Sequence, residues 1–163
     1  MKKLETLLKD YADHVAERAT KGIPPLPLNA EQTNCVTNLL EQKTNYENEY
    51  LLDLLINKVP PGVDEAAYVK ASWLTAIVNG EKNCKYINAQ KAIQILGTMI
   101  GGYNVSSLIE ILKSKNNLHA KAAASVLKNI ILVYDAANDI FDLAQNNIYA
   151  KEVVDSWANG EWF

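Results

Sequence analysis

The sequence predicts an all-α protein, built as an α-solenoid or superhelical bundle of about eight helices in antiparallel pairs. Three observations lead to this prediction. Apolar residues recur at spacings of three and four along most of the chain, which is the helical period. No stretch alternates apolar and polar residues as a half-buried strand would. Proline and glycine clusters interrupt the helical segments, and the short connections between them favour antiparallel neighbours. A compact irregular bundle is the alternative.

The composition is that of an ordinary globular domain. The chain has 163 residues, of which 48% are hydrophobic and 21% are charged. A chain of this size buries about 70% of its unfolded surface, so we expect residues 1–163 to form one domain. The net charge of -3 and the single arginine, Arg18, argue against nucleic-acid recognition. No signal peptide or membrane span is recognised, so we expect reduced thiols and a cytoplasmic protein.

The first part of the chain predicts two helices joined by a proline-rich segment. Apolar residues at helical spacing run over 3–20, and a glycine follows. The segment 23–28, IPPLPL, is too rich in proline for a helix, and we expect it to lie extended along the helices that follow. Asn29 and Gln32 have the spacing of a capping box, which opens the second helix.

The clearest helix pair lies in 51–80, LLDLLINKVPPGVDEAAYVKASWLTAIVNG. Leucines give 51–59 a broad apolar face, and the Pro-Pro-Gly corner at 60–62 forbids continuation of that helix. Asp64 stands where a helix N-terminus favours negative charge. The second helix then ends at Gly80.

Two more helices are predicted around a pair of glycines. Asn88 is the expected N-cap of a helix whose apolar face includes Ile100 and which Gly101-Gly102 ends. Asn104 or Ser106 is expected to cap the next, short helix, which stops at the polar run KSKNN.

The C-terminal third predicts one long buried helix and one shorter helix. Helical phase continues from about 118 to 144, with a break near 135–139 as the alternative. The last helix is expected over about 147–158. The apolar positions assigned to these helices include Tyr134, Phe141, Ile148 and Trp157.

Four segments carry a family resemblance. NKVPPGVDEAAYVKASWLTAIVNGE at 57–81, ILGTMIGGYN at 95–104, HVAERATKGIPPLPL at 14–28 and the terminal SWANGEWF resemble the N-terminal helical domain of bacterial aconitase B. That family is the bifunctional aconitate hydratase and methylisocitrate dehydratase. The resemblance covers essentially the whole chain, in order. It implies a HEAT-like α-solenoid that precedes the catalytic domains of a longer enzyme.

The resemblance also implies a function. The parent enzyme would isomerise citrate to isocitrate through cis-aconitate in the tricarboxylic acid cycle, and this domain would be non-catalytic, shaping substrate access and mediating association. The implied partners are the remaining catalytic domains, a second copy or other metabolic enzymes and, at family level, messenger RNA. The alternative is a freestanding helical scaffold or adaptor for a protein partner, with RNA less favoured. An independent enzyme is the least favoured reading, because His, Cys and Arg are scarce.

The cofactor implied by the resemblance is a four-iron four-sulfur cluster, which three cysteines hold in an aconitase. This chain has only Cys35 and Cys84, which lack cluster spacing. We therefore expect no catalytic, cofactor or metal residue here. Cys35 is predicted to be a core thiol, and Cys84 either an inert or a modestly activated one. His14 is predicted to cap or pack, and His119 to lie on the surface in a first helical turn.

The residues predicted to form an interface are few. They are Gly101, Gly102, Tyr103, Asn104, Trp162 and Phe163. The tyrosine and asparagine either face a partner or only complete a tight corner. The two terminal aromatic residues either fold back or mark a continuing polypeptide.

Three carboxylates share one side of a predicted helix. They are Asp135, Asp139 and Asp142. They form either a solvated acidic face, which we favour, or a site for a hard cation.

Overall fold

The structure is a computed structural model that describes residues 2–42, 46–130 and 132–160. The described residues form nine helices and no strand, apart from one isolated bridge between Cys84 and Ile87. This confirms the all-α prediction, with one helix more than expected. The helices are α1 (Lys2–Thr20), α2 (Ala30–Glu41), α3 (Asn48–Asn57), α4 (Glu65–Val78), α5 (Ala89–Gly97), α6 (Tyr103–Leu112), α7 (Asn117–Leu127), α8 (Ala136–Ala144) and α9 (Ile148–Asn159).

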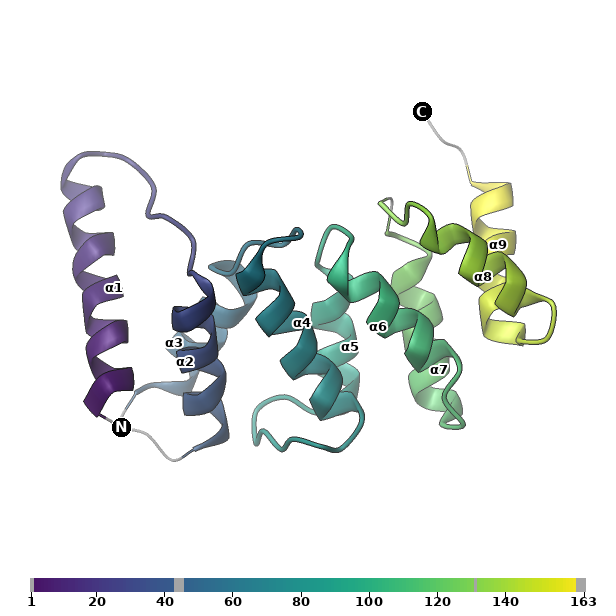
Figure 1. The fold of residues 1–163 in the computed structure, drawn as a ribbon, viewed down its shortest axis with the longest axis horizontal. Helices are drawn as coiled ribbons and strands as arrows, with labels where there is room; N and C mark the ends of the chain where they lie inside the picture. The colour runs from purple at the N-terminus through teal and green to yellow at the C-terminus, as the bar shows by residue number, and fades with distance from the viewer. Residues whose placement is uncertain (1, 43–45, 131, 161–163) are drawn as a thin grey trace.

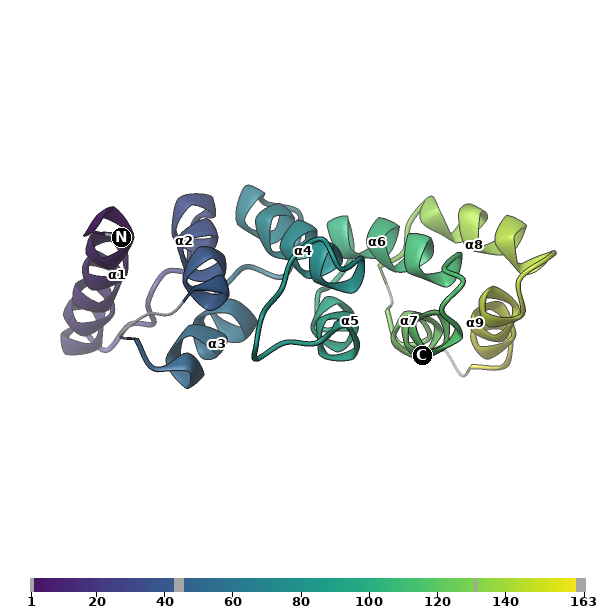
Figure 2. The same ribbon diagram turned by 90° about the horizontal axis from the view of Figure 1, so that it is seen from below.

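The helices stack in two rows, as Figure 2 shows. One row contains α2, α4, α6 and α8, and the other contains α3, α5, α7 and α9. Successive helices pair across the rows, and each pair packs on the next through contacts such as α2 with α4 and α5 with α7. Helix α1 packs on α2 at the N-terminal end of the row. The elongated arrangement in Figure 1 is an α-solenoid, as the sequence predicts.

The apolar core runs between the two rows. Fully buried leucines from both rows meet there, and each stabilises the fold by roughly 2 kcal/mol. Helix α4 is buried on more sides than one apolar face predicts, since it contacts α2, α5 and α6. The leucines that mark this core are Leu39, Leu55, Leu74, Leu96, Leu108 and Leu127.

Three predicted helix starts are confirmed. Asn29 and Gln32 form a reciprocal capping box at α2. The Asp64 carboxylate accepts hydrogen bonds from the first-turn amides of α4 at 2.9 and 3.1 Å. Asn88 accepts one from the amide of Lys91 at 2.8 Å, which caps α5.

The prediction that α5 continues to Gly101-Gly102 is wrong. Helix α5 ends at Gly97, and Ile100 is exposed rather than part of a buried face. The carboxamide of Asn104 donates to the carbonyl oxygens of Leu96 at 2.8 Å and Met99 at 3.2 Å. These bonds satisfy carbonyls in the turn after α5, where no further helical turn supplies amide donors.

The predicted cap of α6 is also wrong. Gly102, rather than Asn104 or Ser106, occupies the N-cap position, and it has no side chain to accept a bond. Asn104 is the second residue of the helix and is fully buried.

A single helix over 118–144 is not formed. Helix α7 ends at Leu127 and α8 begins at Ala136, so the connection lies earlier than the predicted break at 135–139. The periodicity is misleading because Ile130 and Val133 lie in the connection and are nevertheless buried at helix-like spacing.

Three apolar positions assigned to the last helices are exposed instead. Tyr134 lies in the connection with a positive φ of 49° and is 71% exposed. Phe141 is 45% exposed and meets the Trp157 ring edge-on, with 6.3 Å between ring centroids. Ile148, the first residue of α9, is also exposed. Each of these positions fits the helical period of the sequence but is not buried in the core between the two rows.

Candidate interaction surface

The connections between helices lie along two edges of the solenoid (Figure 1). We call the edge at the top of that view the upper edge and the opposite one the lower edge. The described connections at the lower edge are 79–88, 113–116 and 145–147. Those at the upper edge are 21–29, 58–64, 98–102 and 128–135, in which residue 131 is not described.

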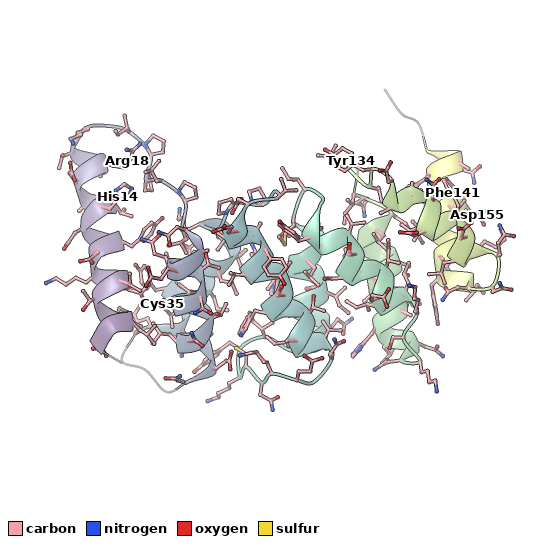
Figure 3. The ribbon with its side chains drawn as sticks, viewed as in Figure 1. His14, Arg18, Cys35, Tyr134, Phe141 and Asp155 are labelled. Carbon is pink, nitrogen blue, oxygen red and sulfur yellow. The ribbon has the colours of Figure 1, made fainter. Side chains whose placement is uncertain are left out.

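The proline-rich segment 23–28 starts the upper edge. It is extended as predicted, but α1, the helix before it, holds it in place. The Leu26 amide donates to Nε2 of His14 at 3.0 Å, and Tyr11 donates to the Leu26 carbonyl at 3.1 Å. Arg18, the single arginine, donates to the carbonyl of Pro24 at 2.6 Å. Figure 3 shows His14 and Arg18 on the upper part of α1. His14 therefore has the packing role predicted for it.

Hydrogen bonds join the first three upper-edge connections along the solenoid. The Leu28 amide donates to the Lys58 carbonyl at 2.8 Å, which joins the proline-rich segment to the α3–α4 connection. The Ile100 amide donates to the Pro61 carbonyl at 3.0 Å, which joins that connection to the α5–α6 connection.

Two glycines allow the upper-edge connections to approach closely. At Gly101, φ is +116°, and a Cβ atom there would lie 2.5 Å from the carbonyl oxygen of Leu132 in the α7–α8 connection. At Gly102, φ is +75°, and a Cβ atom would collide with the side chain of Val63 in the α3–α4 connection. The glycine pair therefore lets three connections touch, rather than ending α5 as predicted.

The upper edge exposes apolar side chains on every described connection. A hollow of about 370 Å³ lies between the α5–α6 and α7–α8 connections, with Ile100 and Leu132 in its lining. Tyr68 and Tyr103, near the starts of α4 and α6, form an exposed edge-to-face pair with centroids 5.1 Å apart. The exposed apolar residues of the connections are Ile23, Leu26, Val63, Ile100, Leu132 and Tyr134.

Tyr134 adds backbone strain to this surface. A left-handed conformation in a residue other than glycine costs about 1–3 kcal/mol and is found where surrounding structure enforces it. Figure 3 shows Tyr134 in the α7–α8 connection, at the upper edge.

The predicted interface residues do not all lie on one surface. Gly101, Gly102 and Tyr103 belong to the upper edge, and Tyr103 is 39% exposed. Asn104 is fully buried and bonds internal carbonyls, so its side chain serves the corner itself. Trp162 and Phe163 lie outside the described residues. The interface role of the corner stays a prediction.

Lys70 is a functional candidate that the sequence analysis missed. It lies on α4, is 1% exposed, and donates from Nζ to the carbonyl of Ile56 at 3.1 Å, near the C-terminal end of α3. Burial lowers the pKa of this lysine to about 8. Its spacing of four from Ala66 and Leu74, both buried, was the signal that could have placed it inside.

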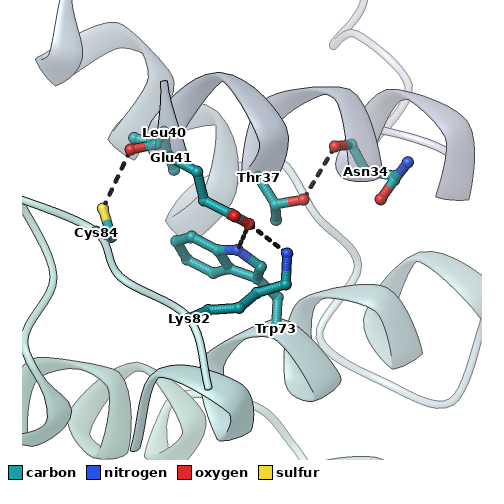
Figure 4. A network of polar contacts seen from close by, with 7 residues as sticks. All are labelled: Asn34, Thr37, Leu40, Glu41, Trp73, Lys82 and Cys84. Atoms are coloured by element: carbon teal, nitrogen blue, oxygen red, sulfur yellow. Dashed lines mark hydrogen bonds and ion pairs between the residues drawn. The ribbon is translucent and has the colours of Figure 1, made fainter. Parts of the chain in front are cut away.

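A second polar network joins α2, α4 and the lower edge (Figure 4). The Glu41 carboxylate accepts from the Trp73 indole at 2.7 Å and from the Lys82 ammonium at 2.7 Å. The indole is buried, so this bond satisfies a donor that would otherwise be lost to water.

The thiols do not fit an iron–sulfur cluster. Cys35 is fully buried on α2 and its Sγ lies 3.2 Å from the carbonyl of Leu4, while burial raises its pKa. This confirms it as a core thiol. Cys84 is half-buried at the lower edge, with Sγ 3.5 Å from the Leu40 carbonyl. Two sulfurs, each directed at a separate backbone carbonyl, cannot provide the three thiolates that a cluster needs.

A polar groove of about 900 Å³ runs between α4, α6 and the start of α7. Its charged residues Glu110 and Lys113 form an ion pair at 2.6 Å, and Thr75 donates to Ser107 at 2.8 Å. His119 lines this groove in the first turn of α7, as predicted. These polar groups are engaged with one another, so the groove offers no obvious catalytic arrangement.

The three aspartates proposed as a possible cation site lie on the surface. Asp135, Asp139 and Asp142 are all exposed. Across the part of the chain that the structure describes, no group of three or more His, Cys, Asp or Glu side chains is placed to hold a metal ion. Within the same residues, no helix has the length and apolar character needed to cross a membrane.

These observations show that the protein is an α-solenoid domain. Its most distinctive surface is the apolar upper edge. A sequence model of the family described as the aconitate B N-terminal domain matches residues 10–163, and the chain belongs to that family.

The relatives are aconitate hydratase B proteins. The chain is 56% identical to that of Synechocystis sp. over 157 residues, which is 96% of this chain and 18% of the relative. It is 48% identical to that of Escherichia coli over 158 residues, again 96% and 18%. It is 44% identical to that of Helicobacter pylori over 160 residues, 98% of this chain and 19% of the relative. The chain thus spans about a fifth of the length of the relatives it matches.

Proposed function

We propose that residues 1–163 act as one non-catalytic domain of an aconitate hydratase B, which associates with the catalytic domains and shapes the access of substrate to them. The observation that carries this proposal is the family match over residues 10–163, in relatives of which the chain is about a fifth. The parent enzyme would interconvert citrate and isocitrate through cis-aconitate.

The chemistry of the parent reaction would lie outside this chain. An aconitase uses an iron of its cluster to polarise the hydroxyl and carboxylate of the substrate. Because the two thiols here do not fit that cluster, its ligands belong to the rest of the parent polypeptide. The role left to this domain is positioning, through its surfaces. Two unpaired thiols are consistent with the cytoplasm as the proposed location.

The test compares the full-length parent enzyme with a form that lacks residues 1–160, at equal cluster content measured by visible absorption. We expect kcat/KM for citrate to change several-fold, because substrate access is altered while the cluster is retained. Equal kcat/KM values for the two forms would overturn the access role. The 163-residue chain alone is expected to show no hydratase activity.

A further inference from the structure

We propose that the upper edge is the surface on which this domain docks, and that its occupant is the part of the same longer polypeptide that follows α9. The proposal rests on the proposed function, since it names the partner surface for the association described there. It is carried by the contacts, exposure and position of the upper edge.

The upper edge is one continuous surface rather than a set of separate loops. Hydrogen bonds from Leu28 to Lys58 and from Ile100 to Pro61 tie its connections together, and Gly101 brings the fourth against the third. A surface whose parts are bonded to one another keeps its shape, which favours docking without a large ordering cost.

The exposed side chains of that surface are mainly apolar. Val63 is 68% exposed and Ile100 is 55% exposed, and the connection 98–102 contains no charged residue. In the α3–α4 connection the carboxylate of Asp64 is already used as the cap of α4. Contiguous exposed apolar groups of this kind mark interaction sites. The matching surface on the occupant would be apolar, with little charge at its centre.

The position of α9 identifies the occupant. Helix α9 begins directly after the lower-edge connection 145–147 and runs across the solenoid. Its end at Asn159 therefore lies at the upper edge (Figure 1). The relatives are about five times longer than this chain, and the matched family is described as an N-terminal domain. The polypeptide that follows α9 in such a protein therefore starts at the apolar surface, and its covalent connection raises its effective concentration there.

The lower edge provides the internal control. Its exposed apolar residues, Tyr86, Leu118 and Ile148, belong to different connections and helix starts. Its connections are dominated by Asn and Lys. Ile148 is 69% exposed, which makes it a matched comparison for Ile100.

The test measures thiol labelling at two single positions. Ile100→Cys and Ile148→Cys are made both in the 163-residue chain and in the full-length parent, and maleimide adducts are quantified on the individual peptides by mass spectrometry. Circular dichroism confirms that each variant is folded. We expect the labelling rate at position 100 to fall by about ten-fold or more in the parent, because a covered thiol reacts only after local opening. The rate at position 148 is expected to be the same in both proteins.

Two outcomes would overturn the proposal. Equal labelling of position 100 in the two proteins would show that the parent leaves the upper edge open. Protection that appears in the 163-residue chain alone and grows with its concentration would assign the edge to a second copy. Protection at position 100 in a parent whose kcat/KM does not depend on residues 1–160 would support docking and overturn only the access role.

Discussion

The two edges of the solenoid are built by different means. At the lower edge, α5, α7 and α9 start with the same kind of side-chain cap, whereas α3, which also starts there, has no side-chain cap bond at its N-cap Glu47. The side chains of Asn88, Asn116 and Asn147 each accept hydrogen bonds from amides of the first helical turn. An asparagine cap is a local feature, set by the few residues around it. The starts of these three helices are therefore determined by nearby residues.

The upper edge has local caps at the starts of α2 and α4, but its C-terminal half depends on contacts between distant segments. Helices α6 and α8 start there with no side-chain cap bond, and the connections before them contact other connections instead. Even the end of α3 is bonded by the buried Lys70 of α4. The difference shows that α5, α7 and α9 satisfy their first amides locally, whereas α6 and α8 start in connections that rely on tertiary contacts and expose apolar side chains.

The largest effect is expected from Gly101→Ala, which breaks the contact between two upper-edge connections. The new methyl group meets the Leu132 carbonyl oxygen in a backbone conformation that favours glycine, so we expect a loss of about 3 kcal/mol in the free energy of unfolding. Urea unfolding measures it. Gly22→Ala is the control, because φ is also positive there but no atom lies within 4 Å, and about 1 kcal/mol is expected. Equal losses at the two positions would contradict the close approach.

Lys70→Met is expected to stabilise the protein at neutral pH. The lysine pKa is lowered from 10.5 to about 8, so the folded state releases its proton before the unfolded state does. Below pH 8 both states are protonated, and the buried charge costs up to about 3 kcal/mol. That cost is relieved as pH rises from 8 towards 10.5. The loss of the bond to Ile56 offsets part of the gain, so we expect about 1–3 kcal/mol in favour of the variant at pH 7.

The measurement is urea unfolding of both proteins at pH 7 and pH 10. The stability advantage of Lys70→Met should shrink at the higher pH. Taking the difference between the proteins removes the contributions of Cys35 and Tyr11, whose pKa values are raised by burial in both. If Lys70→Met is less stable than the unsubstituted 163-residue chain at both pH values, the Lys70 ammonium is well solvated or strongly bonded in the folded state.

Asn147→Ala tests the local device of the lower edge. Its side chain accepts from the amides of Tyr149 and Ala150 and donates to the Leu112 carbonyl at 2.9 Å. We expect a loss of about 1–2 kcal/mol in the free energy of unfolding. Asn146→Ala, one position earlier, is the control and should stay within about 0.5 kcal/mol. If the two variants unfold alike, the cap does not hold the edge.

The smallest effect on stability is expected from Ile100→Asp. This side chain is exposed, so the free energy of unfolding should change by no more than about 0.5 kcal/mol. Binding of a fluorescent hydrophobic dye should nevertheless fall, because the variant interrupts the upper edge. Ile148→Asp should leave dye binding nearly unchanged. A large loss of stability in Ile100→Asp would mean that the Ile100 side chain is packed against the domain rather than exposed to solvent.

The difference between local and tertiary contacts also explains what could be predicted from the sequence. The caps at Asn29 and Asn88 and the helix start at Asp64 were predicted correctly, because the capping side chain and the amides it binds lie within three residues. Helix periodicity likewise predicted an all-α fold with antiparallel pairs. Local chemistry was sufficient where local chemistry determines the structure.

The errors concentrate at the upper edge and in the connections that form it. The helix predicted to reach Ile100 ends three residues earlier, at a place where Asn104 bonds carbonyls across the corner. The α7–α8 connection was predicted as helix because Ile130 continues the helical spacing of Leu127, although Ile130 is buried by tertiary packing outside any helix. No single-sequence pattern contains the approach of Gly101 to Leu132, which depends on two segments about 30 residues apart.

Hydrogen–deuterium exchange on the full-length parent enzyme and on the 163-residue chain tests the central claim most directly. The account predicts slower exchange in the parent for peptides that cover 98–102 and 128–135, and unchanged exchange for peptides that cover 113–116 and 145–147. Slower exchange at the lower edge, or no change at either edge, would contradict docking through the apolar surface.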